Sequence, residues 1–204
     1  MKKQSSTFLL ALLLLLPLHT ACAAQNQALE GLEILRRGFV GVGDFTAEIV
    51  QQKELSLMRQ KLVSRGVVRF MKPGLFFMEL YPPYASRLLL QDNQLSYVLT
   101  DEGVREKVVL PPEESIGRWF AYLERPVTTL PDGVELSAER QGESWTLHIA
   151  PRGKGGVRAF HISFMADGRL QRLIIEERNG DRTTLKFSKL RKNVGLTAQD
   201  FTLD

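Results

Sequence analysis

Residues 66–99 read GVVRFMKPGLFFMELYPPYASRLLLQDNQLSYVL, and large apolar side chains recur in them at every second position. This is the period of a β-strand with one apolar face. The alternating residues are Val68, Phe70, Phe76, Met78, Leu80, Leu88, Leu90, Leu95, Tyr97 and Leu99. Residues that favour turns separate the runs, at 72–74, 82–83 and 92–93. The segment therefore predicts roughly three or four antiparallel strands that share one apolar face.

The N-terminus is typical of a secretory signal peptide. Two lysines precede an apolar run from Phe8 to Leu18, and small residues follow it. We therefore expect residues 1–24 to be a leader and residues 25–204 to form one domain. The run is shorter than the roughly 20 apolar residues of a membrane span, so the predicted destination is the periplasm.

Cys22 is the only cysteine of the chain and lies in the predicted leader. A cysteine at such a place can be acylated, but the recognition sequence for that reaction has a leucine where this chain has His19. We therefore expect cleavage after Cys22, with acylation of Cys22 as the alternative. A mature chain without cysteine folds in an oxidising compartment without disulfides.

The segment before the central strands predicts one helix and two strands. Ala28, Leu32, Leu35 and Phe39 form one apolar stripe at helical spacing, which favours an amphipathic helix packed on a sheet. A first strand is expected from Asp44 onward. A second strand, with a weaker pattern, is expected through Leu55 and Leu57, and the central block is expected to begin at Gly66.

Beyond the central block the alternation continues, interrupted by one helical signal. Ile116, Trp119 or Phe120, and Leu123 have the spacing of a short helix that Pro126 closes. A short helix between strands needs a surface to lean on, so we interpret it as a lid. Further strands are predicted at 104–110, 134–139, 144–150, 157–165, 170–177 and 183–190. About ten antiparallel strands joined mainly by short turns predict a mainly β, strongly curved sheet or barrel.

A search for catalytic groups finds little. His148 and His161 lie on what we expect to be neighbouring strands, where they can share a face and approach each other. We interpret them as half-buried or exposed strand residues, with a lipid hydrolase as an alternative. Glu176 and Glu177 point to opposite faces of a strand and so do not converge on one substrate. Without a nucleophile elbow, a phosphate loop or ligand spacing, we expect no enzyme, no cofactor and no metal site.

The charge pattern argues against a nucleic-acid partner. The formal net charge is +4, and the basic residues are dispersed without aromatic residues between them. We interpret them as a solvated surface, with attraction to an anionic membrane as an alternative.

The one-sided apolar pattern has two readings. It can be an ordinary core, or it can be the wall of a cavity for an apolar guest. An acyl chain of about 16 carbons gains on the order of 10 kcal/mol on leaving water, at roughly 0.8 kcal/mol per methylene. Since an open apolar groove invites aggregation, a helix that closes over it is expected, and the segment with Trp119 and Phe120 could serve.

Several motifs, in their order, resemble a known family. The strand Phe45–Gln51, the block with Lys72-Pro73-Gly74 and Phe76, and the later Asp167-Gly168-Arg169 are similar to the LolA-like carriers of outer-membrane lipoproteins. This resemblance implies an incomplete antiparallel barrel of about ten to eleven strands, with an N-terminal helix and a helical lid over a concave apolar face. It also implies a periplasmic chaperone that receives acylated lipoproteins from an inner-membrane ABC transporter and delivers them to an outer-membrane acceptor.

The residues expected to hold lipid come from the apolar face and the lid. They are Val68, Phe70, Phe76, Met78, Leu80, Leu88, Leu90, Trp119, Phe120 and Leu123. By the resemblance, Lys72 stands where the family usually has an arginine that latches the lid, although lysine lacks the planar donor fork. We expect a non-enzymatic monomer that carries lipoproteins or a related lipid. The alternative is an envelope-stress module that senses lipids or lipoproteins and binds a membrane regulator.

Overall fold

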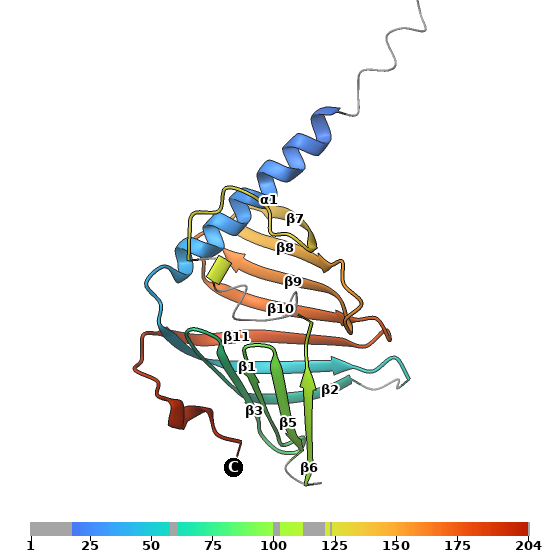
Figure 1. The fold of residues 1–204 in the computed structure, drawn as a ribbon, viewed down its shortest axis with the longest axis vertical. Helices are drawn as coiled ribbons and strands as arrows, with labels where there is room; N and C mark the ends of the chain where they lie inside the picture. The colour runs from blue at the N-terminus through green and yellow to red at the C-terminus, as the bar shows by residue number, and fades with distance from the viewer. Residues whose placement is uncertain (1–17, 58–60, 100–102, 112–120, 123, 204) are drawn as a thin grey trace, which may run out of the picture.

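The computed structural model describes residues 18–57, 61–99, 103–111, 121–122 and 124–203, which form an antiparallel sheet of eleven strands preceded by a helix (Figure 1). The elements are α1 (Leu18–Phe39), β1 (Asp44–Glu54), β2 (Lys61–Met71), β3 (Leu75–Leu80), β4 (Ser86–Gln91), β5 (Gln94–Leu99), β6 (Val104–Val109), β7 (Val134–Gln141), β8 (Ser144–Pro151), β9 (Val157–Met165), β10 (Leu170–Glu177), β11 (Arg182–Lys192) and the 3-10 helix η2 (Ala198–Phe201). The predicted fold class, a mainly β and strongly curved antiparallel sheet with an N-terminal helix, is confirmed.

The strand order is β6-β5-β4-β3-β2-β1-β11-β10-β9-β8-β7. The chain therefore builds one half of the sheet outward from β1, begins the other half at its far edge with β7, and returns to β1 through β11. β6 and β7 are the free edges, so the sheet does not close on itself. In Figure 1, β3, β5 and β6 run steeply across the direction of β1 and β11, which shows how strongly the sheet turns.

One face of the sheet, here called the inner face, carries the apolar core. In the first half, Phe45 and Phe70 stack with their ring centroids 5.2 Å apart, beside Val68 and Met78. In the second half, Trp145 and Leu147 lie beneath α1, which crosses β7 and β8 in Figure 1. The core exists on this face because period-two alternation sends every second residue of each strand to the same side.

The helix packs as its apolar stripe predicts. Ala28, Leu32 and Leu35 are at most 6% exposed, and Phe39 packs its ring edge against Phe45. α1 begins at Leu18, inside the predicted leader, and the leader boundary itself stays a prediction. Among the described helices, none combines the length and the apolar character that crossing a membrane requires.

The predicted strand through Leu55 and Leu57 is wrong. β1 extends to Glu54, residues 55–57 belong to the connection that follows, and the Leu57 side chain is 98% exposed. The second strand is Lys61–Met71, so Gly66 lies in the middle of this strand instead of at its start. The prediction failed because the turn residues around these two leucines are polar but include neither glycine nor proline. An apolar residue in such a turn resembles a strand position.

The C-terminal segment covers part of the other face, here called the outer face. Phe77 points outward between Phe76 and Met78, yet it is only 2% exposed, because η2 packs on β3. The guanidinium of Arg69 lies 5.3 Å from the centre of the Phe77 ring and donates a 3.4 Å hydrogen bond to the carbonyl of Asp200. Both faces of β3 are therefore buried in its central part.

Candidate functional site

The strands β3 to β6 carry a mainly apolar surface on the inner face, here called the inner wall. Phe76 pairs with Leu90, Leu90 with Leu95, and Leu95 with Val108, so one row of apolar side chains crosses the four strands. Cross-strand partners in antiparallel ladders point to the same face. Neighbouring rows add Met78, Leu88 and Tyr97, which end at Glu106 on β6, and then Leu80, Leu99 and Val104, with Ser86 of β4 among them.

Exposure rises along this wall toward the free edge. Phe70, beside the wall on β2, is fully buried, Leu90 is 8% exposed, and Val108 on the edge strand β6 is 48% exposed. Val104 and Val108 lie on the inner face of this edge strand, with Glu106 between them on the same face, and their exposed apolar area gains nothing from solvent. The wall is therefore part core and part accessible apolar surface, the kind of patch that marks a binding site.

The predicted lipid-binding residues that the structure describes all share the inner face. Val68 and Phe70 are fully buried, Met78, Leu80 and Leu90 are nearly so, and Phe76 and Leu88 are partly accessible. The remaining predicted residues, Trp119, Phe120 and Leu123, lie outside the described residues. That any of these residues binds lipid stays a prediction.

The most accessible part of the inner wall was missed by sequence reasoning. Val104 and Val108 occupy inner-face positions of β6 and are 37% and 48% exposed. The sequence carries no period-two signal for them, because the three charged residues Arg105, Glu106 and Lys107 stand between the two valines. Leu95, Tyr97 and Leu99 were placed on the apolar face but not in the candidate site.

The segment that follows the predicted lid is tied down at two points. The amino group of Lys72, in the turn between β2 and β3, lies 3.3 Å from a carboxylate oxygen of Glu124. The amide of Val127 donates a 3.2 Å hydrogen bond to Glu33 on α1. Residues 121 and 122 are helical, but Ile116, Trp119, Phe120 and Leu123, on which the predicted lid helix rests, lie outside the described residues. The latch role of Lys72 stays a prediction.

Glu33 is held ionised by its neighbours. Two hydrogen bonds from Arg36, at 2.7 Å each, together with those from Val127 and Arg37, lower the pKa of Glu33 to about 2, against the smaller opposing effect of burial. The hydroxyl of Tyr122 donates a hydrogen bond to the carbonyl of Thr129, and the Tyr122 ring packs on the apolar cluster beneath α1. These contacts anchor the segment over β7 to β9.

The two strand histidines meet as predicted, but on the outer face. The Nδ1 atoms of His148 and His161 are 2.6 Å apart. Glu139 lies 3.6 Å from the Nε2 of His148, and Glu176 lies 3.5 Å from the Nε2 of His161. The pair is remote from the inner wall because Leu147 and Ile162, its strand neighbours, point to the opposite side. Among the described residues no group of histidines, cysteines and carboxylates forms a metal centre.

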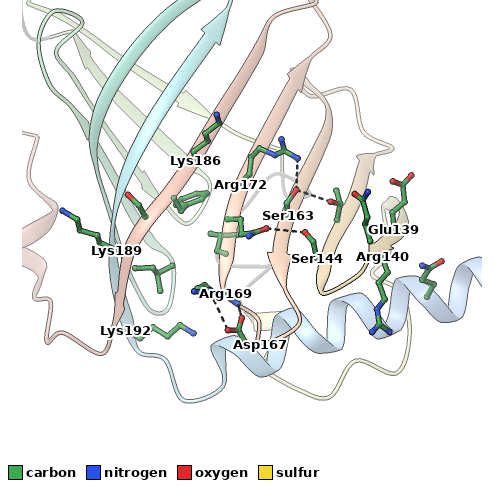
Figure 2. Close-up of a pocket in the computed structure, with 18 residues that line it drawn as sticks. Glu139, Arg140, Ser144, Ser163, Asp167, Arg169, Arg172, Lys186, Lys189 and Lys192 are labelled. Carbon is green, nitrogen blue, oxygen red and sulfur yellow. Dashed lines mark hydrogen bonds and ion pairs between the residues drawn. The ribbon is translucent and has the colours of Figure 1, made fainter.

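A cavity of about 1540 Å³ extends from the gap between the start of β10 and the second half of β11 across residues of β7, β8 and β9, and Figure 2 shows the residues that line it. Its lining is mostly polar, with Ser144, Ser163 and several basic residues, so it is distinct from the apolar inner wall.

Solved structures of similar shape resemble the chain at low sequence identity. They include an outer membrane lipoprotein-sorting protein domain from Vibrio parahaemolyticus (TM-score 0.47, 14% identity, covering 86% of this chain and 97% of that one). A LolA superfamily protein from Nitrosomonas europaea has a TM-score of 0.47 at 11% identity, with 86% and 97% coverage. The Pseudomonas aeruginosa MucA/MucB complex has 0.43 at 12% identity, with 87% and 61% coverage.

A comparison with curated protein sequences found no match. The family model described as outer membrane lipoprotein carrier protein LolA matches residues 41–204, which is most of the chain and includes every strand of the sheet. The chain therefore belongs to the LolA family of outer membrane lipoprotein carrier proteins.

Proposed function

We propose that this protein is a periplasmic carrier that binds the acyl chains of lipoproteins, or of a related lipid, on its inner wall and takes them from the inner to the outer membrane. It does so without catalysing a reaction. An inner-membrane ABC transporter loads it, and an outer-membrane acceptor unloads it. Membership of the family supports this proposal, and one structural observation carries it.

That observation is the gradient of exposure along the inner wall. The buried end, at Phe70 and Leu90, is part of the packed core, whereas the open end at Val104 and Val108 leaves apolar area in contact with water. An acyl chain laid on the open end removes this area from water at about 25 cal/mol per Å². A fully buried core would offer no such gain, and a polar face would offer no affinity.

The contacts of Glu124 and Val127 suit a carrier that must release its cargo. The Lys72–Glu124 ion pair is half exposed at its carboxylate, and such surface pairs contribute about 0–1 kcal/mol. A closure held this weakly opens at little cost. We propose that Lys72 latches the segment when the wall is empty and that loading breaks the pair.

Two neighbouring valines of β6 allow a matched test. Val108 faces the inner wall, whereas Val109 faces the other side and is 71% exposed. Val108→Glu places a carboxylate against the bound acyl chain and is expected to weaken binding of a fluorescent fatty acid at least tenfold. Val109→Glu adds the same charge to the same strand and should bind like the wild type.

Equal binding by both variants and the wild type would place the lipid elsewhere, and no binding by the wild type would contradict the carrier function itself. Native mass spectrometry of the protein purified from the periplasm provides the second readout, with a retained acylated molecule expected. Recovery of a membrane-bound stress regulator in a pull-down, without a transporter subunit or retained lipid, would instead favour the signalling alternative.

A further inference from the structure

The sheet splits between β10 and β11. The ladder between these strands ends at the pair Arg172–Lys186. β11 nevertheless continues to Lys192. Of its residues 187–192, Phe187, Ser188, Arg191 and Lys192 pair only with β1, and Lys189 and Leu190 form a bulge in that ladder, with Lys189 at a φ of 49°. On the other side of the split, the first residue of β10, Leu170, pairs with Phe164 of β9. Residues 187–192 therefore present a bulged strand edge inside the sheet that, in the described part of the chain, no second strand covers. At the far end of the split, Gly38 of α1 lies against Gly168 and accepts a hydrogen bond from the amino group of Lys192.

The cavity of about 1540 Å³ includes this split, is lined by both of its borders, and extends from it across residues of β7, β8 and β9. Figure 2 shows Arg169 and Arg172 on one border and Lys186, Lys189 and Lys192 on the other. Drug-sized ligands occupy pockets of roughly 300–1,000 Å³, so this volume suits a longer, polymeric guest. An unpaired strand edge in such a cavity offers backbone hydrogen bonds to an extended chain, which is the basis of recognition by strand addition.

The last cross-strand residue pair of the β10–β11 ladder, here called its last rung, carries two like charges. Arg172 and Lys186 are direct cross-strand partners, an arrangement that is unfavourable without a counter-charge. Neither takes part in an ion pair among the described residues, and Arg172 reaches only the hydroxyl of Ser163, at 3.5 Å. The other charged rung of this ladder, Glu176–Arg182, joins opposite charges 4.0 Å apart. The mismatch is therefore confined to the rung that borders the split.

The remaining charges of the cavity favour the same guest. Six arginines and lysines line it, against the carboxylates of Glu139 and Asp167. Arg169 is paired with Asp167 and Lys189 with Glu48, which leaves Arg140, Arg172, Lys186 and Lys192 without an ion pair among the described residues. The two faces of the split also differ. Phe187 and Leu190, on β11, pack toward the inner apolar cluster, whereas Arg172 and Lys186 lie on the outer face.

From these observations we propose that the split receives an extended acidic polypeptide segment of a partner protein, which adds as a strand to residues 187–192 of β11. Successive side chains of a strand point to opposite faces. Acidic side chains at every second position would meet Arg172 and Lys186, and apolar side chains at the alternate positions would meet Phe187 and Leu190. The site does not require lipid on the inner wall, so it stands independently of the carrier proposal.

The test uses the full-length chain and a fluorescent synthetic peptide of about eight residues with alternating Glu and Val, long enough to span the roughly 20 Å of the free edge. Binding is measured by fluorescence anisotropy. The double variant Arg172→Gln with Lys186→Gln is expected to weaken binding at least tenfold. The matched control, Arg105→Gln with Lys107→Gln, removes the same charges from the free edge strand β6 and should leave the affinity unchanged.

Two further probes separate strand addition from simple charge attraction. The same peptide with N-methylated backbone amides cannot pair as a strand and is expected to bind at least tenfold more weakly. Hydrogen exchange at residues 187–192 should slow when the unmodified peptide is added. The proposal would be overturned if the methylated peptide bound with equal affinity, or if the Arg172/Lys186 double variant bound the peptide as tightly as the wild type. It would also be overturned if the wild type did not bind the peptide. Competition by vesicles of anionic phosphatidylglycerol at equal strength would assign the split to lipid headgroups and overturn it as well.

Discussion

Gly66 is the position at which a single added carbon should do the most damage to the sheet. It pairs with Ile49 on β1 and with Leu80 on β3, so it lies in the middle of three strands. A Cβ at this position would come within 1.9 Å of the carbonyl oxygen of Glu79 and within 3.0 Å of the Cα of Leu80. The change Gly66→Ala therefore forces two backbones apart, because neither contact involves a side chain that could turn away.

The magnitude follows from that distance. Real Cβ contacts essentially never fall below 3.0 Å, so β2 and β3 must separate locally by about 1 Å. A gap of this size forfeits a quarter to a half of the dispersion energy of the atoms facing it. It also weakens the ladder at the Gly66–Leu80 rung, where β2–β3 pairing begins. Overpacking of a well-packed region costs about 1–3 kcal/mol, and with backbone on both sides we expect about 3 kcal/mol.

Urea denaturation followed by circular dichroism measures this change. With a slope of about 2 kcal/mol per M, the midpoint of Gly66→Ala should fall by about 1.5 M. Gly156→Ala is the matched control, because an added Cβ there meets nothing within 4 Å, and its midpoint should stay within about 0.3 M of the wild type. A Gly66→Ala midpoint that equals that of the control would refute the close approach of β2 and β3.

Further predictions concern the ties of the lid segment, the C-terminal cover and the histidines. Glu33→Gln should cost about 1–2 kcal/mol of unfolding free energy at pH 7. The pKa of Glu33 is about 2 in the folded protein, below its unfolded value near 4.5. The contribution of Glu33 to stability is therefore full above pH 4.5 and disappears as the pH falls toward 2. Urea denaturation at several pH values will check this. Lys72→Ala should change the unfolding free energy by less than about 1 kcal/mol yet speed fatty-acid uptake in stopped-flow fluorescence; an unchanged rate would remove the latch role. Phe201→Ala should destabilise the fold by about 3 kcal/mol in thermal unfolding and expose Phe77 to solvent, unlike a change at exposed Val194. His148→Ala should leave fatty-acid affinity unaltered, and a loss of affinity would connect the outer face to the lipid site.

Much of the fold could be predicted because its signal is local. The alternation of Val68, Phe70, Phe76 and Met78 identifies both the strands and the face they share, and the structure confirms it. The amphipathic helix before β1 was predictable for the same reason. The weak second strand was misplaced because a connection with apolar residues such as Leu57 has no local feature that separates it from a strand end.

The candidate site was less predictable than the fold. Sequence pattern places Phe70 and Leu88 on the same face, but it does not say that the first is fully buried and the second partly accessible. Exposure depends on which elements cover each position, and these come from distant parts of the chain. Phe77 illustrates the point, since an outward strand position is buried by residues more than a hundred positions later.

The amino-acid sequence by itself determined the period, the turns and the face of each strand, because these depend on neighbours within a few residues. The tertiary structure alone decided the pairing of β1 with β11, the split beyond the Arg172–Lys186 rung, and the exposure of Val108 at the free edge. Each of these depends on how strands far apart in the chain align and how the whole sheet bends. Register and curvature are collective properties of the assembled sheet, and the alternation along one strand is compatible with many values of either.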